Sequence, residues 1–302
     1  MMICYISCIR FKSEVYMSKI AIVTDSNSGI TQKRAKELGV YVVPMPLYIN
    51  DVPYYEDITL TQEEFYKKLT SDPDVSTSMP TPVSIMELWE QLLINYDAVV
   101  HIPMASGLSG TCELATGLAM EYEGKVEVVD NCRISVVLEQ SVLDALTLRE
   151  QGKSAREIKR ILEQEKYNER VYLTVDTLKY LKKGGRVTPT AAAIGSVLNI
   201  KTILTFKGDK IDAFAKARGW KAAKRSMIEA IQYDINHEFG SMKDQLRMMV
   251  AYTDSKDAAD VWVQELHEVF PEYQIEARPL SLSVACHIGP GCLAVTICKA
   301  IS

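Results

Sequence analysis

The chain has 302 residues, of which 47% are hydrophobic and 24% charged, and this length is typical of two globular domains rather than one. Its formal net charge of −5 argues against general electrostatic binding to nucleic acid or to an anionic membrane, because both polyanions repel an acidic protein. The seven cysteines include no CxxC pair and are odd in number, which favours a reducing, cytoplasmic location over a disulfide framework.

The first sixteen residues do not have the order of a secretory signal peptide. Arg10 and Lys12 follow the apolar stretch, whereas a signal peptide has its basic residues before it. Met17 directly precedes Ser18 and the first clear strand, so we expect translation to start there and residues 1–17 to be an extension outside the fold. Since no apolar run approaches the roughly 20 residues that span a bilayer, we expect no stable membrane insertion.

Apolar runs of strand length alternate with helical patterns through the first half, which predicts a mostly parallel sheet flanked by helices. Helix starts are expected at the capping boxes led by Thr61 and Ser154, and at Thr81 before Pro82. The stretch from Asn50 to Thr59 is typical of a turn or small hairpin. The expected strands are Ile20–Thr24, Val40–Pro46, Val99–Ile102, Val126–Val129 and Val171–Val175.

The pattern changes after about Val175, where we place the boundary between a first domain, 18–175, and a second, smaller α/β domain with two layers, 176–302. The change begins with a short helix to Leu181, a break at Gly184-Gly185 and a small-residue helix from Ala191 to Val197. The later elements are strands at Ile200–Phe206, Ile211–Phe214, Met248–Tyr252 and Leu293–Ile297, a helix after Arg218 and a helix at Asp257–Phe270.

Two hydroxyl-rich loops precede predicted helices in the first domain. Ser109, Gly110 and Thr111 open one helix, where backbone N–H groups and hydroxyls suit a carboxylate or phosphate. Thr77 and Ser78 precede another, and loops at the carboxyl ends of parallel strands converge on one crevice. Taken alone, each loop is explained equally well by hydroxyls that merely cap a helix.

Two motifs of the second domain are weak when taken singly. Arg186 follows Gly184-Gly185, where the backbone can approach a ligand, but an exposed basic turn at a helix end explains it better. His287 lies in a Gly/Pro turn, and a lone histidine is more often structural. We interpret the other histidines, His101, His237 and His267, as packing or surface residues.

Several binding motifs are absent from the sequence. It has no GxxxxGK[ST] phosphate loop, no GxGxxG after a strand and no HExxH, which removes support for nucleotide hydrolysis, dinucleotide binding and zinc-protease chemistry. We therefore expect binding without a cofactor or a metal.

Six motifs occur in a fixed order along the chain: T-D-S-N-S (24–28), T-S-M-P-T (77–81), L-S-G-T (108–111), G-G-R (184–186), L-N-I-K (198–201) and H-I-G-P-G (287–291). Together they make the chain resemble the DegV family from about Lys19 to the end. The family is known as the fatty-acid-binding subunit, FakB, of a bacterial fatty acid kinase.

The resemblance implies that Thr77 and Ser109 hydrogen-bond the carboxylate of a long-chain fatty acid and that His287 completes this polar cluster. Ser78, Gly110 and Thr111 belong to the same two motifs and are included in the expected binding site. The second domain would close over the ligand, whose tail is buried.

The resemblance also implies a partner. Arg186 would lie near the carboxylate and the kinase-docking surface, and Arg218 on that docking surface. A separate ATP-binding kinase subunit would phosphorylate the presented carboxylate, so this chain would be a non-catalytic carrier.

The sequence departs from the family pattern at three positions. Met79 stands where glutamine is usual, Ala105 replaces the first serine of a common pair, and Ile288 stands where threonine is frequent. The first two changes remove polar partners from the expected head-group region, and they either retune the accepted lipid or are tolerated.

Two other functions fit the same residues. A serine hydrolase would use Ser109 with His287 and Asp25, although Thr111 replaces the last glycine of a nucleophile elbow and its β-carbon would crowd that turn. A regulatory module would hold a small anion on the hydroxyl loops and would have no apolar tunnel.

Overall fold

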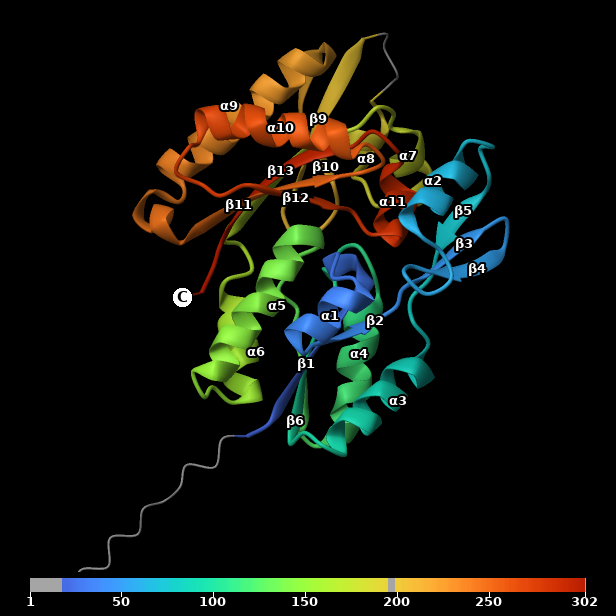
Figure 1. Ribbon diagram of the computed structural model, residues 1–302, viewed down its shortest axis with the longest axis vertical. Helices are drawn as coiled ribbons and strands as arrows, with labels where there is room; N and C mark the ends of the chain where they lie inside the picture. The colour runs from blue at the N-terminus through green and yellow to red at the C-terminus, as the bar shows by residue number, and fades with distance from the viewer. Residues whose placement is uncertain (1–17, 195–198, 302) are drawn as a thin grey trace, which may run out of the picture.

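The computed structural model describes residues 18–194 and 199–301, which form three sheets and the helices around them (Figure 1). The predicted extension at residues 1–17 lies outside the described residues. The predicted helix from Ala191 to Val197 is described only as far as residue 194. In this described part, a short helix runs from Pro189 to Ala192.

The first sheet is parallel throughout and has the strand order β2-β1-β6-β7. Helices α1, α5 and α6 share an apolar cluster with one face, and α3 and α4 share another with the opposite face. The predicted parallel sheet flanked by helices is therefore confirmed. Its strands are β1 (Ile20–Asp25), β2 (Tyr41–Val43), β6 (Ala98–Ile102) and β7 (Val126–Val128), and its helices are α1 (Gln32–Leu38), α3 (Pro82–Leu93), α4 (Thr111–Ala119), α5 (Ser135–Glu150) and α6 (Ala155–Gln164), with short 3₁₀ turns η1 (Ser26–Ser28) and η2 (Met120–Tyr122).

A small antiparallel sheet of order β4-β3-β5 stands beside the first sheet. Two of its strands form a hairpin over residues 46–55, which starts before the stretch from Asn50 to Thr59 where a turn or hairpin was predicted. Asn50 and Asp51 at its turn both have positive φ, as a type I′ turn requires. One of its two packed helices comes from near the C-terminus, so this sheet joins distant parts of the chain. The elements are β3 (Pro46–Ile49), β4 (Val52–Tyr55), β5 (Val75–Thr77), α2 (Gln62–Leu69) and α11 (Leu282–Ile288).

The second large sheet is antiparallel except for one edge pair, with the order β10-β9-β8-β13-β11-β12. Figure 1 shows α9 and α10 on its outer face and α5 on the inner side. The elements are β8 (Glu169–Thr174), α7 (Lys179–Gly184), α8 (Pro189–Ala192), β9 (Ile200–Phe206), β10 (Asp212–Arg218), α9 (Gly219–His237), η3 (Gly240–Gln245), β11 (Leu246–Tyr252), α10 (Lys256–Val269), β12 (Glu276–Pro279) and β13 (Leu293–Lys299).

One strand belongs to a different sheet from the one predicted. Strand β8 was expected in the first, parallel sheet, but it pairs antiparallel with β9 and β13 in the second. Sheet membership therefore changes before β8, while the domain boundary at 175/176 stays a prediction.

A continuous apolar core joins the two large sheets. The inner side chains of the second sheet, such as Leu173 and Ala294, share a buried cluster with residues of α5 such as Val136. The predicted helix starts are confirmed, with capping boxes at Thr61 and Ser154. This packing places α5, α11 and the inner face of the second sheet around one interior region.

Candidate functional site

A cavity of about 430 Å³ opens where the small sheet, the α4 loop and α11 meet, within the roughly 300 to 1,000 Å³ usual for ligand sites. Six of the eight predicted binding and docking residues line the cavity, and a seventh, Thr111, lies directly behind one of them. The lining residues are Asn27, Met45, Thr77, Ser78, Met79, Met104, Leu108, Ser109, Gly110, Ile134, Arg186, Ile211, Ser283, Val284, His287 and Ile288.

A hydrogen bond joins Thr77 and His287 in the wall of the cavity. Thr77 is the last residue of β5, and its Oγ1 lies 2.8 Å from Nε2 of His287 in the last turn of α11. The small sheet fixes this contact, because β5 pairs with β3 and α11 packs on both strands. Two residues that are distant in the sequence thus form one polar unit.

The imidazole of His287 packs against the glycine pair of the G-G-R motif. A β-carbon on Gly184 would overlap Nδ1 of the ring and would lie 3.1 Å from its Cγ. Burial lowers the pKa of His287 to about 4, and the charge of Arg186 acts in the same direction. The ring is therefore neutral at pH 7, with one nitrogen protonated and the other an acceptor.

Ser109 and Thr111 form the second polar unit. Their hydroxyl oxygens are 2.9 Å apart, and the backbone N–H of Thr111 donates to Ser109 Oγ at 3.3 Å. Thr111 is fully buried and begins α4, so it lies behind Ser109 and does not line the cavity. The positive end of α4 lies at this loop, which favours a negative group beside Ser109.

At the cavity, Arg186 links the turn that follows α7 to the loop that precedes α4. Its Nη1 donates to the carbonyl of Gly184 at 2.6 Å, and its Nε donates to the carbonyl of Leu108, in the α4 loop, at 3.4 Å. The guanidinium therefore holds the G-G-R turn against the Ser109 loop and adds positive charge to the cavity wall.

The structure places the remaining predicted residues as follows. Ser78 and Gly110 line the cavity from exposed positions, whereas Arg218 is exposed at the end of β10 and is not a lining residue. Strand β10 starts directly after the lining residue Ile211, and its length separates Arg218 from the cavity by roughly 20 Å.

The three departures from the family pattern occupy different environments. Met79 lines the cavity, and its sulfur would lie 2.9 Å from a β-carbon on Gly110, so the glycine makes room for the methionine. Ile288 lines the cavity as well. Ala105 is fully buried, with its N–H bonded to the carbonyl of Arg133, and is not a lining residue.

Asn27 and Ser283 line the cavity without having been predicted as site residues. Ser283 Oγ donates to Asn27 Oδ1 at 2.6 Å, and Asn27 Nδ2 lies 2.9 Å from the sulfur of Met104. Asn27 is part of the T-D-S-N-S motif, which was quoted only for the resemblance. Ser283 lies in an ordinary helix start, and nothing in the sequence distinguishes it.

A small apolar pocket, which we name the channel, adjoins the cavity on the side of the second sheet. It encloses about 60 Å³ and shares lining residues with the cavity, among them Leu108, Val284 and Ile288. Its walls come from the inner face of the second sheet, the start of α5, and α11. Its further lining residues are Ile134, Ser135, Val136, Val171, Leu173, Phe206, Ile211, Ala251, Leu280, Cys292, Ala294 and Thr296.

The contacts of Ser109, His287 and Asp25 do not form a catalytic triad. Among the described contacts, His287 bonds Thr77 and Ser109 bonds Thr111. The carboxylate of Asp25 accepts from the backbone N–H groups of Asn27 and Met104. Burial raises the pKa of Asp25 to about 6. A triad needs the base hydrogen-bonded to both partners, so this geometry does not favour the hydrolase.

Two features are absent from the described part of the chain, 18–194 and 199–301. Within it, no group of three or more histidine, cysteine, aspartate or glutamate side chains is placed to hold a metal ion. No helix there is both long and apolar enough to cross a bilayer.

Comparison with known proteins decides the family. The family described as "Uncharacterised protein, DegV family" matches residues 19–300. The chain belongs to the DegV family. A DegV domain-containing protein of Deinococcus radiodurans is 30% identical over 280 residues, which cover 92% of this chain and 98% of the relative. Another, from Caldanaerobacter subterraneus subsp. tengcongensis, is 35% identical over 214 residues, covering 70% of this chain and 76% of the relative.

Solved structures of DegV proteins share the fold. A fatty-acid-binding DegV family protein from Thermus thermophilus superimposes with a TM-score of 0.84 at 29% identity, covering 93% of this chain and 99% of that chain. DegV of Bacillus subtilis, described as a fatty acid binding protein, gives 0.80 at 28% identity with the same coverage. The predicted family and α/β architecture are confirmed.

Proposed function

We propose that this DegV protein binds one long-chain fatty acid, with the carboxylate at Thr77, Ser109 and His287 and the acyl tail in the apolar channel. The observation that carries the proposal is that a largely apolar cavity, with a polar group at Thr77, Ser109 and His287, shares lining residues with a deeper apolar channel. A site for a small anion has no use for the channel. Its DegV relatives from T. thermophilus and B. subtilis, which bind fatty acids, support the same ligand class.

Each head-group hydroxyl has a second donor behind it. If His287 carries its proton on Nε2, it donates to Thr77 Oγ1, and the hydroxyl proton of Thr77 is then free to point at a carboxylate. Thr111 similarly donates its N–H to Ser109 Oγ, and if its hydroxyl donates to the same oxygen, the hydroxyl proton of Ser109 is free for the ligand. Both pairs thereby favour an acceptor-only group such as a carboxylate.

The tail supplies most of the affinity, and the head group supplies orientation. Burial of some 14 methylenes at about 0.8 kcal/mol each gives on the order of 10 kcal/mol before ordering costs are subtracted. Hydrogen bonds to a carboxylate contribute about 1.5 to 3 kcal/mol each. The acid is therefore required for tight binding but does not set most of its strength.

We further propose that the bound acid is presented to a separate kinase subunit that brings ATP and forms the acyl phosphate in the cytoplasm. Ser78 and Gly110 are exposed beside the head-group hydroxyls, so a partner can reach the carboxylate. Arg186 at the mouth and the exposed Arg218 offer cationic contacts for that partner. This chain would act as the non-catalytic carrier.

A ligand titration of delipidated protein tests the binding proposal. We expect palmitate to displace a fluorescent fatty acid, methyl palmitate to bind at least tenfold more weakly, and inorganic phosphate not to compete. Thr77→Val and Ser109→Ala should each weaken palmitate binding roughly tenfold. Matched controls are Ser76→Ala and Ser106→Ala, exposed neighbours that do not line the cavity.

Two results of this titration would count against the proposal. Equal palmitate binding by the site variants and their controls would remove the head-group assignment. Binding of phosphate without binding of palmitate would favour the small-anion module.

A further inference from the structure

The floor of the acyl channel follows two neighbouring strands away from the head-group cavity. On β13 and β8, Ala294 lies opposite Leu173 and Thr296 opposite Val171, and all four side chains line the channel. Side chains two apart on a strand point to the same face. The next pair on this face is therefore Cys298 opposite Glu169, one row or roughly 7 Å further along.

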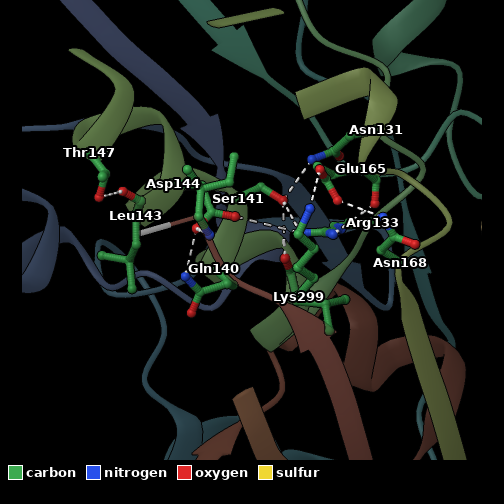
Figure 2. A network of polar contacts seen from close by, with 12 residues as sticks. Asn131, Arg133, Gln140, Ser141, Leu143, Asp144, Thr147, Glu165, Asn168 and Lys299 are labelled. Carbon is green, nitrogen blue, oxygen red and sulfur yellow. Dashed lines mark hydrogen bonds and ion pairs between the residues drawn. The ribbon is translucent and has the colours of Figure 1, made fainter. Parts of the chain in front are cut away.

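A buried cluster of ionisable side chains lies around Cys298 in that next row. We use the name end cluster for Arg133, Asp144 and Glu169, whose side chains are at most 2% exposed. Arg133 Nη1 lies 3.9 Å from Asp144 Oδ2 and donates to Ser141 Oγ at 3.1 Å (Figure 2). Arg133 immediately precedes the lining residues Ile134 and Ser135, so the start of α5 is a second segment that leads from the channel to the cluster.

The end cluster is fixed in place by the fold around it. Arg133 Nη2 donates to the carbonyl of Glu165 at 3.0 Å, and Asp144 Oδ1 accepts from the backbone N–H of Ile301 at 2.9 Å. Lys299 pairs with the Glu165 carboxylate at 2.6 Å (Figure 2). The cluster thus ties the start and middle of α5 to the end of α6 and to the last strand, so displacing it would break several of these contacts.

An acyl tail loses affinity when it reaches the end cluster. Each further methylene buried in the channel tightens binding by roughly fourfold. Stripping a buried charge of its partners weakens a state by on the order of a hundredfold or more. Arg133 Nε and Glu169 Oε2 already lack a hydrogen-bond partner among the described residues, and a terminal methyl group cannot supply one.

We propose that the end cluster closes the far end of the channel and sets the longest acyl chain that this protein accepts. The proposal rests on the proposed fatty-acid function and adds its chain-length specificity. Burial raises the pKa of Glu169 to about 8, so at pH 7 the charged part of the end cluster is the Arg133–Asp144 pair, and Glu169 adds a buried polar carboxyl group that an apolar tail cannot hydrogen-bond.

The test compares chain-length profiles of the wild type and a cluster variant. The triple variant Arg133→Met, Asp144→Asn, Glu169→Met removes the ion pair and the buried carboxyl group together, so no charge stays buried without its partner. A matched control, Lys224→Met with Glu265→Gln, removes an ion pair of 2.9 Å between α9 and α10, on the outer face of the same sheet. Kd is measured for laurate, palmitate, stearate, arachidate and behenate by displacement of a fluorescent fatty acid.

In the triple variant we expect the tightest ligand to shift to a longer acid. The Kd of behenate relative to palmitate should fall at least tenfold, while the control keeps the wild-type order. An unchanged order in a folded triple variant would overturn the proposal. If the wild type bound none of these acids, the proposed function would fail along with it.

A measurement on the wild-type chain covers the case in which the triple variant does not fold. A fatty acid with a diazirine at its terminal carbon is bound and irradiated, and the labelled peptides are mapped by mass spectrometry. Label on residues 131–135, 169–171 or 296–298 supports the proposal. Label confined to other segments, such as the small sheet, would overturn it.

Discussion

Replacing Gly184 by alanine tests the role of the His287 ring, because the substitution suits helix α7 but displaces the ring. Gly184 is the last residue of α7, and its φ is not positive, so an alanine fits the backbone and should favour the helix by up to about 1 kcal/mol. Its β-carbon, however, would overlap Nδ1 of His287 and lie 3.1 Å and 3.3 Å from the ring Cγ and the β-carbon of that residue. The ring must therefore shift from its present position, which disturbs its hydrogen bond to Thr77.

Loss of the 2.8 Å hydrogen bond between Thr77 and His287 costs about 0.5 to 1.5 kcal/mol. Gly184→Ala should therefore raise the Kd for palmitate about 2- to 12-fold, measured by isothermal titration. Gly117→Ala is the control, because a β-carbon at this glycine of α4 meets nothing within 4 Å, and it should leave the Kd unchanged. Unchanged affinity in a folded Gly184→Ala protein would refute the role of the ring contact.

Two further predictions concern stability and pH. His101 is fully buried, and its ring nitrogens have no hydrogen-bond partner among the described residues. Burial lowers its pKa in the folded protein to about 3, below the unfolded value near 6.5. The free energy of unfolding therefore falls as the pH drops below 6.5. His101→Leu should raise the free energy of unfolding, measured by urea denaturation, by about 1 to 3 kcal/mol at pH 7 and by more at pH 5. No gain at either pH would contradict this. Glu56 accepts from the backbone N–H of Leu282 at 2.9 Å, and burial raises its pKa to about 7; stability therefore falls as pH rises from about 4.5 to 7. Glu56→Gln should make that slope shallower by up to about 1.4 kcal/mol per pH unit, and an unaltered slope would count against the carboxyl group as its source.

Local features of the fold were predictable because they depend on neighbouring residues. The helix starts at Thr61, Thr81 and Ser154 follow from side chains that bond N–H groups three positions ahead. Strand β8 was recognised as a strand but placed in the wrong sheet, because an apolar run does not specify its partner. Its actual neighbour β13 is the last strand of the chain.

The candidate site was predictable only in part, for the same reason. The resemblance brought Thr77, Ser109 and His287 together, and the structure places all three around one cavity. The contact of His287 with Gly184, and the lining by Ser283, depend on where α11 packs. The channel itself is enclosed by α5, α11 and the second sheet, so no single segment predicts it.

A crystal structure with palmitate brominated at its terminal carbon tests the central claim most directly, because it locates both ends of the ligand. The account predicts the carboxylate within hydrogen-bond distance of Thr77 Oγ1 and Ser109 Oγ, and an anomalous bromine peak between β13 and α5, near Thr296. A carboxylate elsewhere, or bromine in solvent with the channel filled by side chains, would contradict it.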